Sequence, residues 1–471
     1  MRPDDLALLR TPGTPAVAPD GRIAVVAVTR PDVAGNGYRS QLWAVPTDAS
    51  APARPLTSGG RDSDPAFSPD GRWLAYLAAL GDGAPQVHVL PTAGGAPRRL
   101  TDAPLGAGAP VWSPDSRRLA WAAVPGGAPE PDAPRLITPR RPRPDDLGPL
   151  ADRPLRVHVL DLPDLLADDD APVPVPVLVG DADPDPVALW RSRDGELVRV
   201  ARGGAVELRR ALSNADPEVL VDGPFTVHGA ACGGGVVVAS VGHDGSAGEL
   251  IAITPGRRRL LTAFGSALAA TGRVHRATAV GASAPDGTPV DGRITVPAGP
   301  GPHPVLVLVP DDRPGWSLQE DVQVAATAGV AVVQCDRAEP EAVLALLDAA
   351  VDDPRLDADR IGVAGGAAAV ELLGRSERFA AAVVEFGRVD EPPAGAVPVP
   401  TLVLHGEQDL RGPGVALHAA LERRGVPAEL LLFPRGGAEV ARTGRPADRV
   451  ARLEHLVRWW RRWLTPAAVV D

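Results

Sequence analysis

The sequence predicts a two-domain protein, in which an N-terminal all-β propeller is followed by a doubly wound, mostly parallel α/β domain. Two patterns support this fold class: a strand-rich motif recurs through the first half of the chain, and apolar strands alternate with helices through the second half. The length also fits, because 471 residues that are 44% hydrophobic can bury a sizeable core in two or three domains.

The recurring motif places a tight turn between two short strands. It reads PAVAPDGRIAVVAV from Pro15, PAFSPDGRWLAYLA from Pro65 and PVWSPDSRRLAWAA from Pro110, so the starts are 50 and 45 residues apart. Pro-Asp-Gly and Pro-Asp-Ser suit a tight hairpin, and the spacing matches one four-stranded propeller blade. Weaker copies begin at Ala188 and Glu249. Residues 1–275 are therefore expected to form a propeller of roughly five to seven blades.

The pattern changes in the second half. Short apolar strands are expected at residues 305–310, 330–336, 360–365, 380–386, 400–406 and 428–434. Helices are expected near residues 319–328, 340–351, 368–373 and 415–424, and an amphipathic helix over residues 449–464 follows the last strand. Continuous apolar strands separated by helices are typical of a mostly parallel sheet that is covered on both faces. The sequence therefore places the α/β domain at residues 276–471.

Charge and composition argue against several classes of partner and cofactor. The formal net charge is −11 and charges of both signs are interleaved, which argues against a nucleic-acid-binding surface. The two cysteines, Cys232 and Cys335, fit neither a disulfide framework nor metal-ligand spacing, and no metal or cofactor is expected. The N-terminus lacks the apolar core of a secretory signal and no apolar run reaches the roughly 20 residues that span a bilayer. A cytoplasmic location without membrane contact is therefore expected.

Four phrases give the chain a family resemblance. They are RDSDPAFSPDGRWLAYL in the first half, and DADRIGVAGG, PTLVLHGEQDLRGP and RTGRPADRVARLEHLVRWWRRWL in the second. Together and in this order they resemble the prolyl oligopeptidase family of serine peptidases, and most closely its acylaminoacyl-peptidase and dipeptidyl-peptidase-like branch. The resemblance covers nearly the whole chain and implies that the second domain is an α/β-hydrolase domain. The family's chemistry is amide or ester cleavage by a serine, histidine and aspartate triad beside an oxyanion hole.

The resemblance places alanine where the family carries its nucleophile. Active relatives have Gly-x-Ser-x-Gly-Gly at a strand-to-helix turn, whereas this chain reads GGAAAV over residues 365–370, with Ala367 in the nucleophile position and Ala368 beside it. Ala367 has no atom that can attack a carbonyl group. The loss of the following glycines is also expected to crowd a turn whose sharpness normally needs them.

When the sequence is matched to the family, it retains only the acid of the other two triad members. Asp409, in HGEQDLRGP, matches the triad aspartate, whose task is to orient a histidine and stabilise its charge. The loop that carries the histidine in relatives reads PRGGAEVARTGRP here, with Ala438 in the histidine position. The histidines at positions 405, 418 and 455 match non-catalytic positions and are expected to be structural.

Two further departures concern the pocket. Relatives carry a His-Gly-Gly-Pro phrase that shapes the oxyanion side, whereas this chain reads PDDRP over residues 310–314. The carboxylates of Asp311 and Asp312 would repel a developing oxyanion. A glycine-rich segment that follows the next strand in relatives is also missing, because QCDRAEPEAVLALL leads almost directly into a helix.

These losses predict a pseudoenzyme, a catalytically inactive homologue of a serine peptidase. The expected role is binding of a peptide or protein ligand in the cavity between the two domains, because ligand sites favour domain interfaces. Two alternatives stay open. One is a repurposed enzyme that uses a carboxylate-rich pocket, and the other is residual serine-type peptidase or esterase activity, as the family suggests.

The repurposed-enzyme alternative depends on charged residues at the carboxyl ends of strands, the rim where open α/β sheets bind ligands. Asp409 lies there, and the candidate pocket contains Asp311, Asp312, Arg313, Asp336, Arg337, Ala368 and Arg411. Such carboxylates could hold a cation, bind a basic substrate, or supply a general acid and base. The competing and stronger explanation is that these aspartates, each with an arginine close by in the sequence, are solvated or form local ion pairs worth little.

The last helix is expected to pack on the sheet. Leu453, Leu456, Val457 and Trp460 recur at helical spacing, and the remaining tryptophans are expected at the edge of this apolar side. A homo-oligomer contact through this helix stays open.

Overall fold

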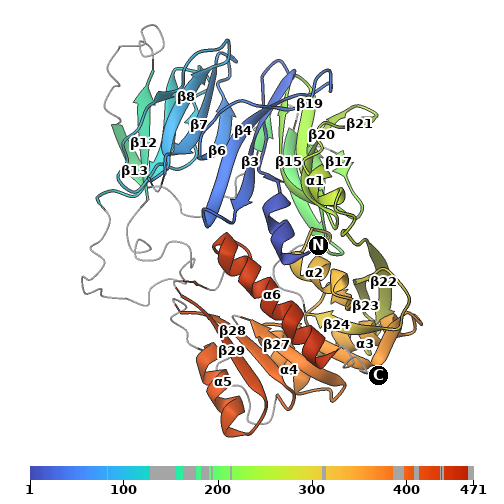
Figure 1. Ribbon diagram of the computed structural model, residues 1–471. Coiled ribbons are helices and arrows are strands. Elements are labelled where there is room, and N and C mark those ends of the chain that lie inside the picture. The colour runs from blue at the N-terminus through green and yellow to red at the C-terminus, as the bar shows by residue number, and fades with distance from the viewer. Residues whose placement is uncertain are drawn as a thin grey trace.

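The computed structural model describes residues 1–81, 83–127, 155–162, 177–181, 190–192, 195–212, 215–309, 315–385, 397–407, 413–434, 436–437 and 440–464. Two domains are visible in Figure 1, a strand-rich N-terminal domain above and an α/β domain with its helices below. The two-domain prediction of a propeller followed by an α/β-hydrolase domain is confirmed.

The N-terminal domain is built from antiparallel four-stranded units. The first comprises β2 (Ala16–Val17), β3 (Ile23–Asp32), β4 (Gly37–Pro46) and β5 (Arg54–Pro55), and β1 (Thr11–Pro12) adds to β3. The second comprises β6 (Arg61–Phe67), β7 (Trp73–Ala79), β8 (Gln86–Pro91) and β9 (Arg98–Arg99). The third comprises β10 (Val111–Trp112), β11 (Arg118–Ala123), β12 (Arg156–Asp161) and β13 (Val177–Asp181).

Two further units complete the described part of the propeller. One comprises β14 (Trp190–Ser192), β15 (Gly195–Arg202), β16 (Ala205–Leu212) and β17 (Ala215–Val221). The other comprises β18 (Thr226–Gly233), β19 (Val236–His243), β20 (Ser246–Thr254) and β21 (Arg257–Leu260). The described residues therefore form five units, and the blade count of the whole chain stays a prediction.

The predicted Pro-Asp-Gly and Pro-Asp-Ser motifs form the turns between the first two strands of each of the first three units. Gly21 and Gly71 have φ angles of 74° and 73°, and Ser116 takes the same position in the third copy with a φ of 62°. A tight hairpin needs this left-handed conformation, which glycine adopts without strain. The motif therefore recurs because these three units share the same turn.

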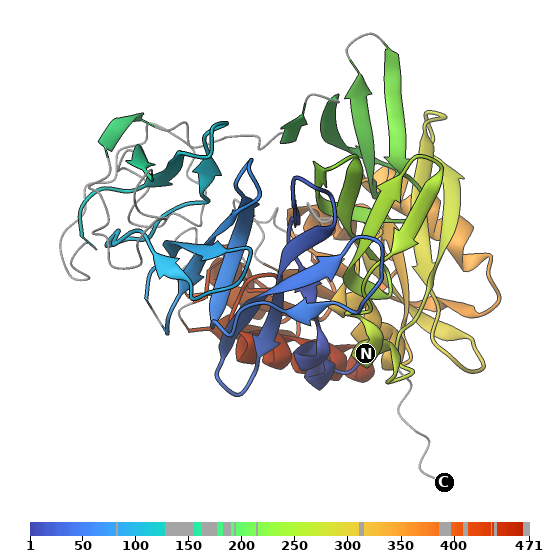
Figure 2. The same ribbon diagram turned by 90° about the horizontal axis from the view of Figure 1, so that it is seen from above.

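The first unit packs on the second, the second on the third and the fourth on the last, and the first unit also packs on the last. One buried cluster joins Val26 and Val45 of the first unit to Val238 and Leu250 of the last. The Ser240 hydroxyl also donates a hydrogen bond to the Pro12 carbonyl at 3.1 Å. Figure 2 shows the blue first strands lying beside the yellow-green last strands. The N-terminal strands therefore close onto the end of the propeller.

The C-terminal domain contains one eight-stranded sheet in the order β22-β23-β25-β24-β26-β27-β28-β29. The strands are β22 (Ala277–Ser283), β23 (Pro289–Thr295), β24 (His303–Leu308), β25 (Ala331–Cys335), β26 (Leu356–Gly365), β27 (Phe379–Glu385), β28 (Thr401–Gly406) and β29 (Ala428–Phe433). The β22–β23 and β23–β25 pairs are antiparallel and all later pairs are parallel. Parallel strands end at one edge, and this arrangement places the ends of β24 to β28 together.

Helices cover both faces of this sheet. The helices are α2 (Glu320–Thr327), α3 (Pro340–Val351), α4 (Ala367–Leu373), α5 (Pro413–Arg423) and α6 (Pro446–Trp463). Leu346 of α3, Leu372 of α4 and Leu417 of α5 belong to the core on one face, whereas Val324 of α2 and Leu453 of α6 belong to the core on the other. Among the described residues, no helix combines the length and apolar character needed to cross a membrane.

The start of the chain packs against the C-terminal domain. The 3-10 helix η1 (Pro3–Leu8) contributes Leu6 to the core that α6 and α2 also form, and Leu268 of α1 (Ser266–Ala269) joins the same core. Asp5 of η1 pairs with Arg273 in the segment that leads into β22. The division of the chain at residue 275 stays a prediction.

Asp244 connects the last propeller unit to the first strand of the C-terminal domain. Its carboxylate accepts hydrogen bonds from Arg276 Nη1 at 2.6 Å and from the Ala277 N–H at 2.7 Å, and its carbonyl accepts one from Gln323 Nε2 at 3.0 Å. Burial opposes ionisation of this carboxyl, but hydrogen bonds from His243, Ala277 and Arg276 outweigh it and lower its pKa from 3.8 to about 2.

We expect the Asp244→Asn variant to lose about 2 kcal/mol of stability at neutral pH. The folded pKa lies below the unfolded pKa, so this stabilisation is present above about pH 4 and is lost as the pH falls toward 2. The measurement is the urea midpoint of both proteins at pH 7, 4 and 3. The difference between them should shrink over that interval, and a constant difference would contradict the assignment.

Candidate active site

The turn between β26 and α4 is the strand-to-helix turn that the resemblance assigned to the nucleophile. β26 ends at Gly365, Gly366 precedes the helix, and Ala367 is the first residue of α4. Ala367 is exposed, whereas Ala369 is fully buried. A Cβ atom on Gly365 would lie 3.1 Å from the Cβ of Val309 and 3.3 Å from that of Ala369, so this position requires glycine. The sequence therefore forms the expected turn and presents a methyl group at its tip.

Ala367 does not have the strained backbone of a nucleophile, and the unusual backbone angles of this turn fall on Gly366. In active α/β-hydrolases the nucleophile lies on a sharp, strained turn that projects its reacting atom. Ala367 is not among the non-glycine residues with a positive φ angle, and Gly366 has φ −90° and ψ −134°. The crowding that was expected from Ala369 is avoided, because its methyl group fills the space beside Gly365, which has no side chain.

The other predicted triad positions lie outside the described residues. This holds for Asp409 and Ala438, and in the candidate pocket for Asp311, Asp312, Arg313 and Arg411. Their assigned roles stay predictions. Ala368, Asp336 and Arg337 are described, and Ala368 follows Ala367 in α4 and is half-buried. The connection from β25 to α3 is as short as the sequence indicated, because Cys335 ends the strand and Pro340 begins the helix.

The predicted local pairing of Asp336 with Arg337 is wrong. Asp336 pairs instead with Arg293 of β23, while Arg337 pairs with Glu339 at 3.2 Å. The reason is strand geometry: Arg293 lies opposite Gln334 of β25, so Asp336 lies on the same side two residues further along. Successive side chains at a strand end point to opposite sides, which separates Arg337 from Asp336.

The Arg293–Asp336 pair is buried at the contact with the propeller. The two side chains are 3% and 11% exposed, and Arg293 lies 5.5 Å from the centre of the Trp316 ring. The Trp316 N–H donates to the carbonyl of Gly204, in the turn between β15 and β16, at 2.9 Å. A Cβ atom on Gly204 would lie 2.5 Å from both Arg293 Nη1 and Asp336 Oδ1. This aspartate is therefore part of the attachment between the domains.

A buried network of charged side chains joins α6 to α2 and to the end of β27. Arg452 of α6 donates to Asp321 of α2 and makes hydrogen bonds of 2.6 Å to Glu385, the last residue of β27. The three side chains are 4%, 7% and 15% exposed. Burial disfavours the charged guanidinium, but the two carboxylates outweigh burial and raise the pKa of Arg452. Glu385 is adjacent to the turn, because Val384 pairs with Gly365.

One helical turn earlier, the same helix is attached to the propeller. Arg449 donates to Glu320 of α2 and, at 2.8 Å, to the hydroxyl of Tyr38 in β4. That hydroxyl donates to the Gly444 carbonyl at 2.7 Å. The sequence offers one sign that both arginines are buried and paired. They lie on the apolar side of α6, one and four residues before Leu453, and a buried arginine is stable only when a carboxylate pairs with it.

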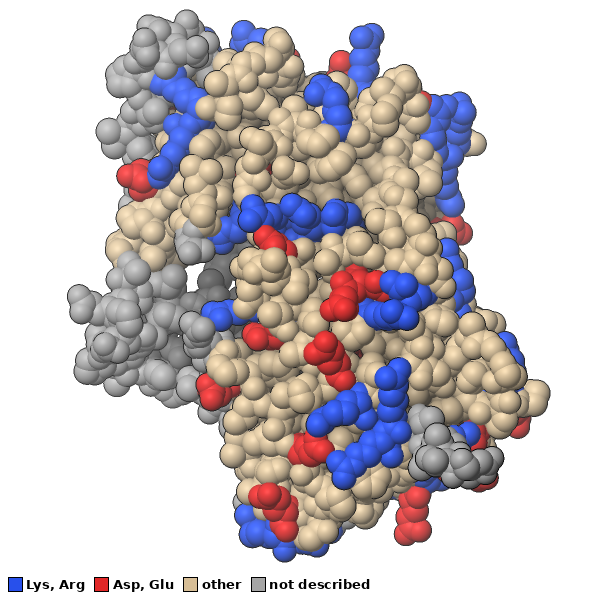
Figure 3. All heavy atoms as spheres, viewed as in Figure 1, with Lys and Arg blue, Asp and Glu red and all other residues tan. Residues whose placement is uncertain are grey.

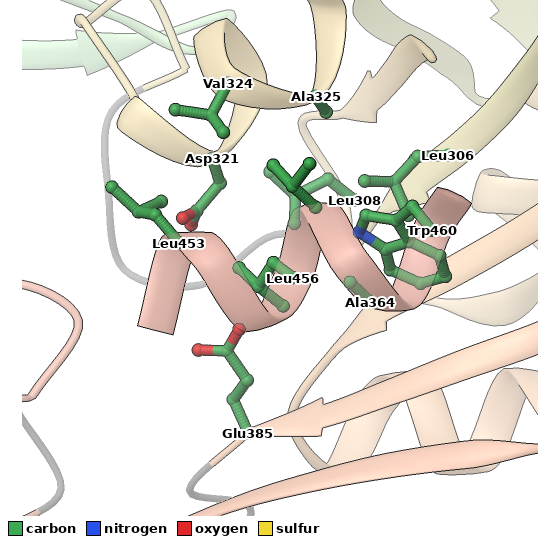
Figure 4. A pocket seen from close by; sticks show the side chains of 11 residues that line it. Leu306, Leu308, Asp321, Val324, Ala325, Ala364, Glu385, Leu453, Leu456 and Trp460 are labelled. Atoms are coloured by element: carbon green, nitrogen blue, oxygen red, sulfur yellow. The ribbon is translucent and has the colours of Figure 1, made fainter. Parts of the chain in front are cut away.

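A small cavity adjoins this network. Its volume of about 20 Å³ leaves room for one water molecule. In Figure 4, Asp321 and Glu385 reach toward α6 from opposite sides, with Leu308, Ala364 and Trp460 nearby. Ala364 directly precedes Gly365, so the cavity lies beneath the strand-to-helix turn. The cavity is too small for a peptide, so it is part of the packing beneath the turn and not a ligand site.

Among the described residues, the carboxylate adjacent to the turn, Glu385, is already paired with Arg452, and Cys335 offers no replacement nucleophile. Cys335 is 1% exposed, and burial raises the pKa of its thiol to about 11, so it is inert. Cys232 lies in the propeller strand β18 and is half-buried. His405 is buried at the end of β28, and His418 lies 3.7 Å from Glu422 within α5. Over the ranges that the structure describes, no group of three or more histidine, cysteine or carboxylate side chains could hold a metal ion.

Known structures share this architecture over its whole length. The chain is similar to the acylaminoacyl peptidase of Pyrococcus horikoshii, with a TM-score of 0.82 at 14% identity, covering 100% of this chain and 98% of that one. It is also similar to the isopeptidase AtxE2, with a TM-score of 0.71 at 18% identity and coverage of 100% and 97%. A prolyl endopeptidase structure gives 0.55 at 13% identity, with coverage of 98% and 91%. The chain has the fold of the prolyl oligopeptidase family.

The sequence comparison adds a shorter match. An uncharacterised peptidase of Bacillus subtilis, YuxL, is 29% identical over 161 residues, which cover 25% of this chain and 24% of that protein. The match thus spans about a quarter of the relative's length. No family model matches the chain. At these identities the structural likeness establishes the fold, and activity has to be argued from the residues.

Proposed function

We propose that the protein is a catalytically inactive homologue of the prolyl oligopeptidase-family peptidases that binds a peptide or protein ligand between its two domains. The observation that carries the proposal is Ala367, which stands exposed and unstrained at the strand-to-helix turn. A triad without its serine and histidine loses about a millionfold in turnover. What remains in such a protein is the capacity to bind.

The alternative of a repurposed carboxylate pocket is disfavoured by one pairing. Asp336 is neutralised by Arg293 and is 11% exposed, so it offers no free carboxylate to a cation or a substrate. Residual serine-type peptidase or esterase activity remains the second alternative.

We expect the purified protein to hydrolyse activated esters and acylated or free-N-terminal peptide anilides no faster than buffer. The Ala367→Ser, Ala438→His double variant and a mock purification from cells without the gene are assayed beside it. We also expect the double variant to stay below the activity of a working serine peptidase, because Ala367 starts α4 without the strained backbone of a nucleophile.

Turnover by the natural protein that exceeds the mock preparation would contradict the proposal. If that turnover resists serine-directed inhibitors, the repurposed-pocket alternative gains support. If such inhibitors abolish it, the residual-peptidase alternative does.

A further inference from the structure

Three arginines, two on neighbouring propeller strands and one directly before a third strand, lie in a row. Arg30 of β3 pairs in register with Arg39 of β4. On the other side of β3, Thr11 of β1 pairs with Thr29, which places Arg10 opposite Arg30. Arg10 directly precedes β1, so the three residues form a row across the start of β1, β3 and β4, here called the arginine ladder. Like charges directly opposite each other destabilise a sheet.

The ladder holds more positive charge than its surroundings neutralise. Asp32 accepts a hydrogen bond from Arg39 Nε at 2.6 Å, whereas Arg10 donates to the backbone carbonyls of Ala7 at 3.1 Å and Leu9 at 2.8 Å. Over the residues that the structure describes, no carboxylate forms an ion pair with Arg10 or Arg30. Three guanidinium groups thus face one carboxylate.

The charges of these groups influence one another. Burial and the positive charge of Arg30 lower the pKa of Arg10. The hydrogen bonds from Arg39 and Gly35, with the charge of Arg30, lower the pKa of Asp32. Arg30 and Arg39 are exposed, so their alignment buries little surface and contributes little to the fold. In a chain with a net charge of −11, this local excess of positive charge would attract an anionic ligand.

The ladder lies beside the contact between the two domains. The hairpin tip between β3 and β4 contacts the start of α6, where Asn36 Oδ1 accepts a hydrogen bond from the Ala447 N–H at 3.0 Å. Arg445, which precedes α6, is exposed. In Figure 3 a band of blue side chains crosses this face between the propeller and the α/β domain. The exposed arginines of the ladder are therefore accessible to a ligand from solvent.

We propose that the arginine ladder binds an acidic segment of a partner protein, whose carboxylates bridge neighbouring guanidinium groups. Adjacent guanidinium groups suit carboxylates, because each presents several donors in a planar fork. A nucleic acid is disfavoured, because a long polyanion would be repelled by the net charge of −11 beyond the ladder. The proposal does not depend on whether the α/β domain is catalytic.

The test is fluorescence anisotropy of a labelled hexaglutamate peptide titrated with the full-length protein at low salt. We expect saturable binding that weakens as salt is raised. The Arg30→Gln, Arg39→Gln variant should raise the Kd about tenfold or more. The matched control is Arg22→Gln, Arg54→Gln, which removes the same charge from exposed positions of the first propeller unit and should change the Kd less than about twofold.

Three results would overturn the proposal. They are no saturable binding by the natural protein, equal weakening in both double variants, and tighter binding of a single-stranded oligonucleotide of equal charge than of the peptide. The melting temperatures of the natural protein and both double variants are measured to check that the variants are folded. The ladder variant should melt close to the natural protein, because both side chains are exposed, and the loss of the exposed Arg39–Asp32 pair is offset by relief of repulsion between Arg30 and Arg39.

Discussion

The Arg452→Met variant should lose about 3–5 kcal/mol of stability, because it leaves two buried carboxylates without their shared cation. Arg452 is 4% exposed, and it holds α6 to Asp321 of α2 and to Glu385 of β27. Methionine keeps much of the apolar length of the side chain, so the loss reports mainly on charge. The measurement is guanidinium unfolding followed by circular dichroism, read on the transition of the α/β domain.

The matched control for this variant is Arg461→Met on the same helix. Arg461 is exposed, and this substitution makes the same change in charge and size. Its effect should stay within about 0.5 kcal/mol. If Arg452→Met were as mild as Arg461→Met, the carboxylates would have to be solvated, and the buried network would not hold α6 in place.

The Trp459→Ala variant should cost about 3–5 kcal/mol, because it opens a large cavity in the core between the sheet and α6. Trp459 is 1% exposed and belongs to the core that also contains Leu453 and Trp460. The same unfolding experiment measures this loss. Trp459→Phe should cost much less, since the buried indole N–H of Trp459 has no hydrogen-bond partner among the described residues and phenylalanine removes it.

Trp463→Ala is the control for position 459. Trp463 is half-buried near the end of α6, and its ring lies 5.1 Å from the guanidinium carbon of Arg462. Its replacement should cost clearly less than that of Trp459. Equal losses of stability at the two positions would mean that Trp459 is no more buried than Trp463, which would contradict the packing described for α6.

The fold could be predicted from the sequence because local signals agreed with it. The helix predicted at residues 340–351 is α3, and the other predicted helices of this domain begin within three residues of the observed ones. Apolar periodicity reports which side of an element is buried, and turn residues mark where it ends. The Pro-Asp-Gly spacing indicated the repeated units for the same reason.

Pairings between distant residues could not be predicted. The ion pair of Arg293 with Asp336 depends on the register of β23 and β25, which no local pattern encodes. The burial of Trp459 was also missed, because α6 packs over a wider arc than the stripe of Leu453, Leu456 and Trp460 suggested. The turn between β26 and α4 could be predicted because it is a local feature, whereas the assignment of Ala367 to the nucleophile position stays a prediction.

The most direct test of the central claim is intact-protein mass spectrometry after incubation with a fluorophosphonate, which phosphonylates activated serines. The natural protein should keep its unmodified mass, because the residue at the strand-to-helix turn is alanine. A single stoichiometric adduct on the natural chain, mapped to any serine by peptide sequencing, would contradict this result. It would reveal an activated nucleophile and make the protein a serine hydrolase.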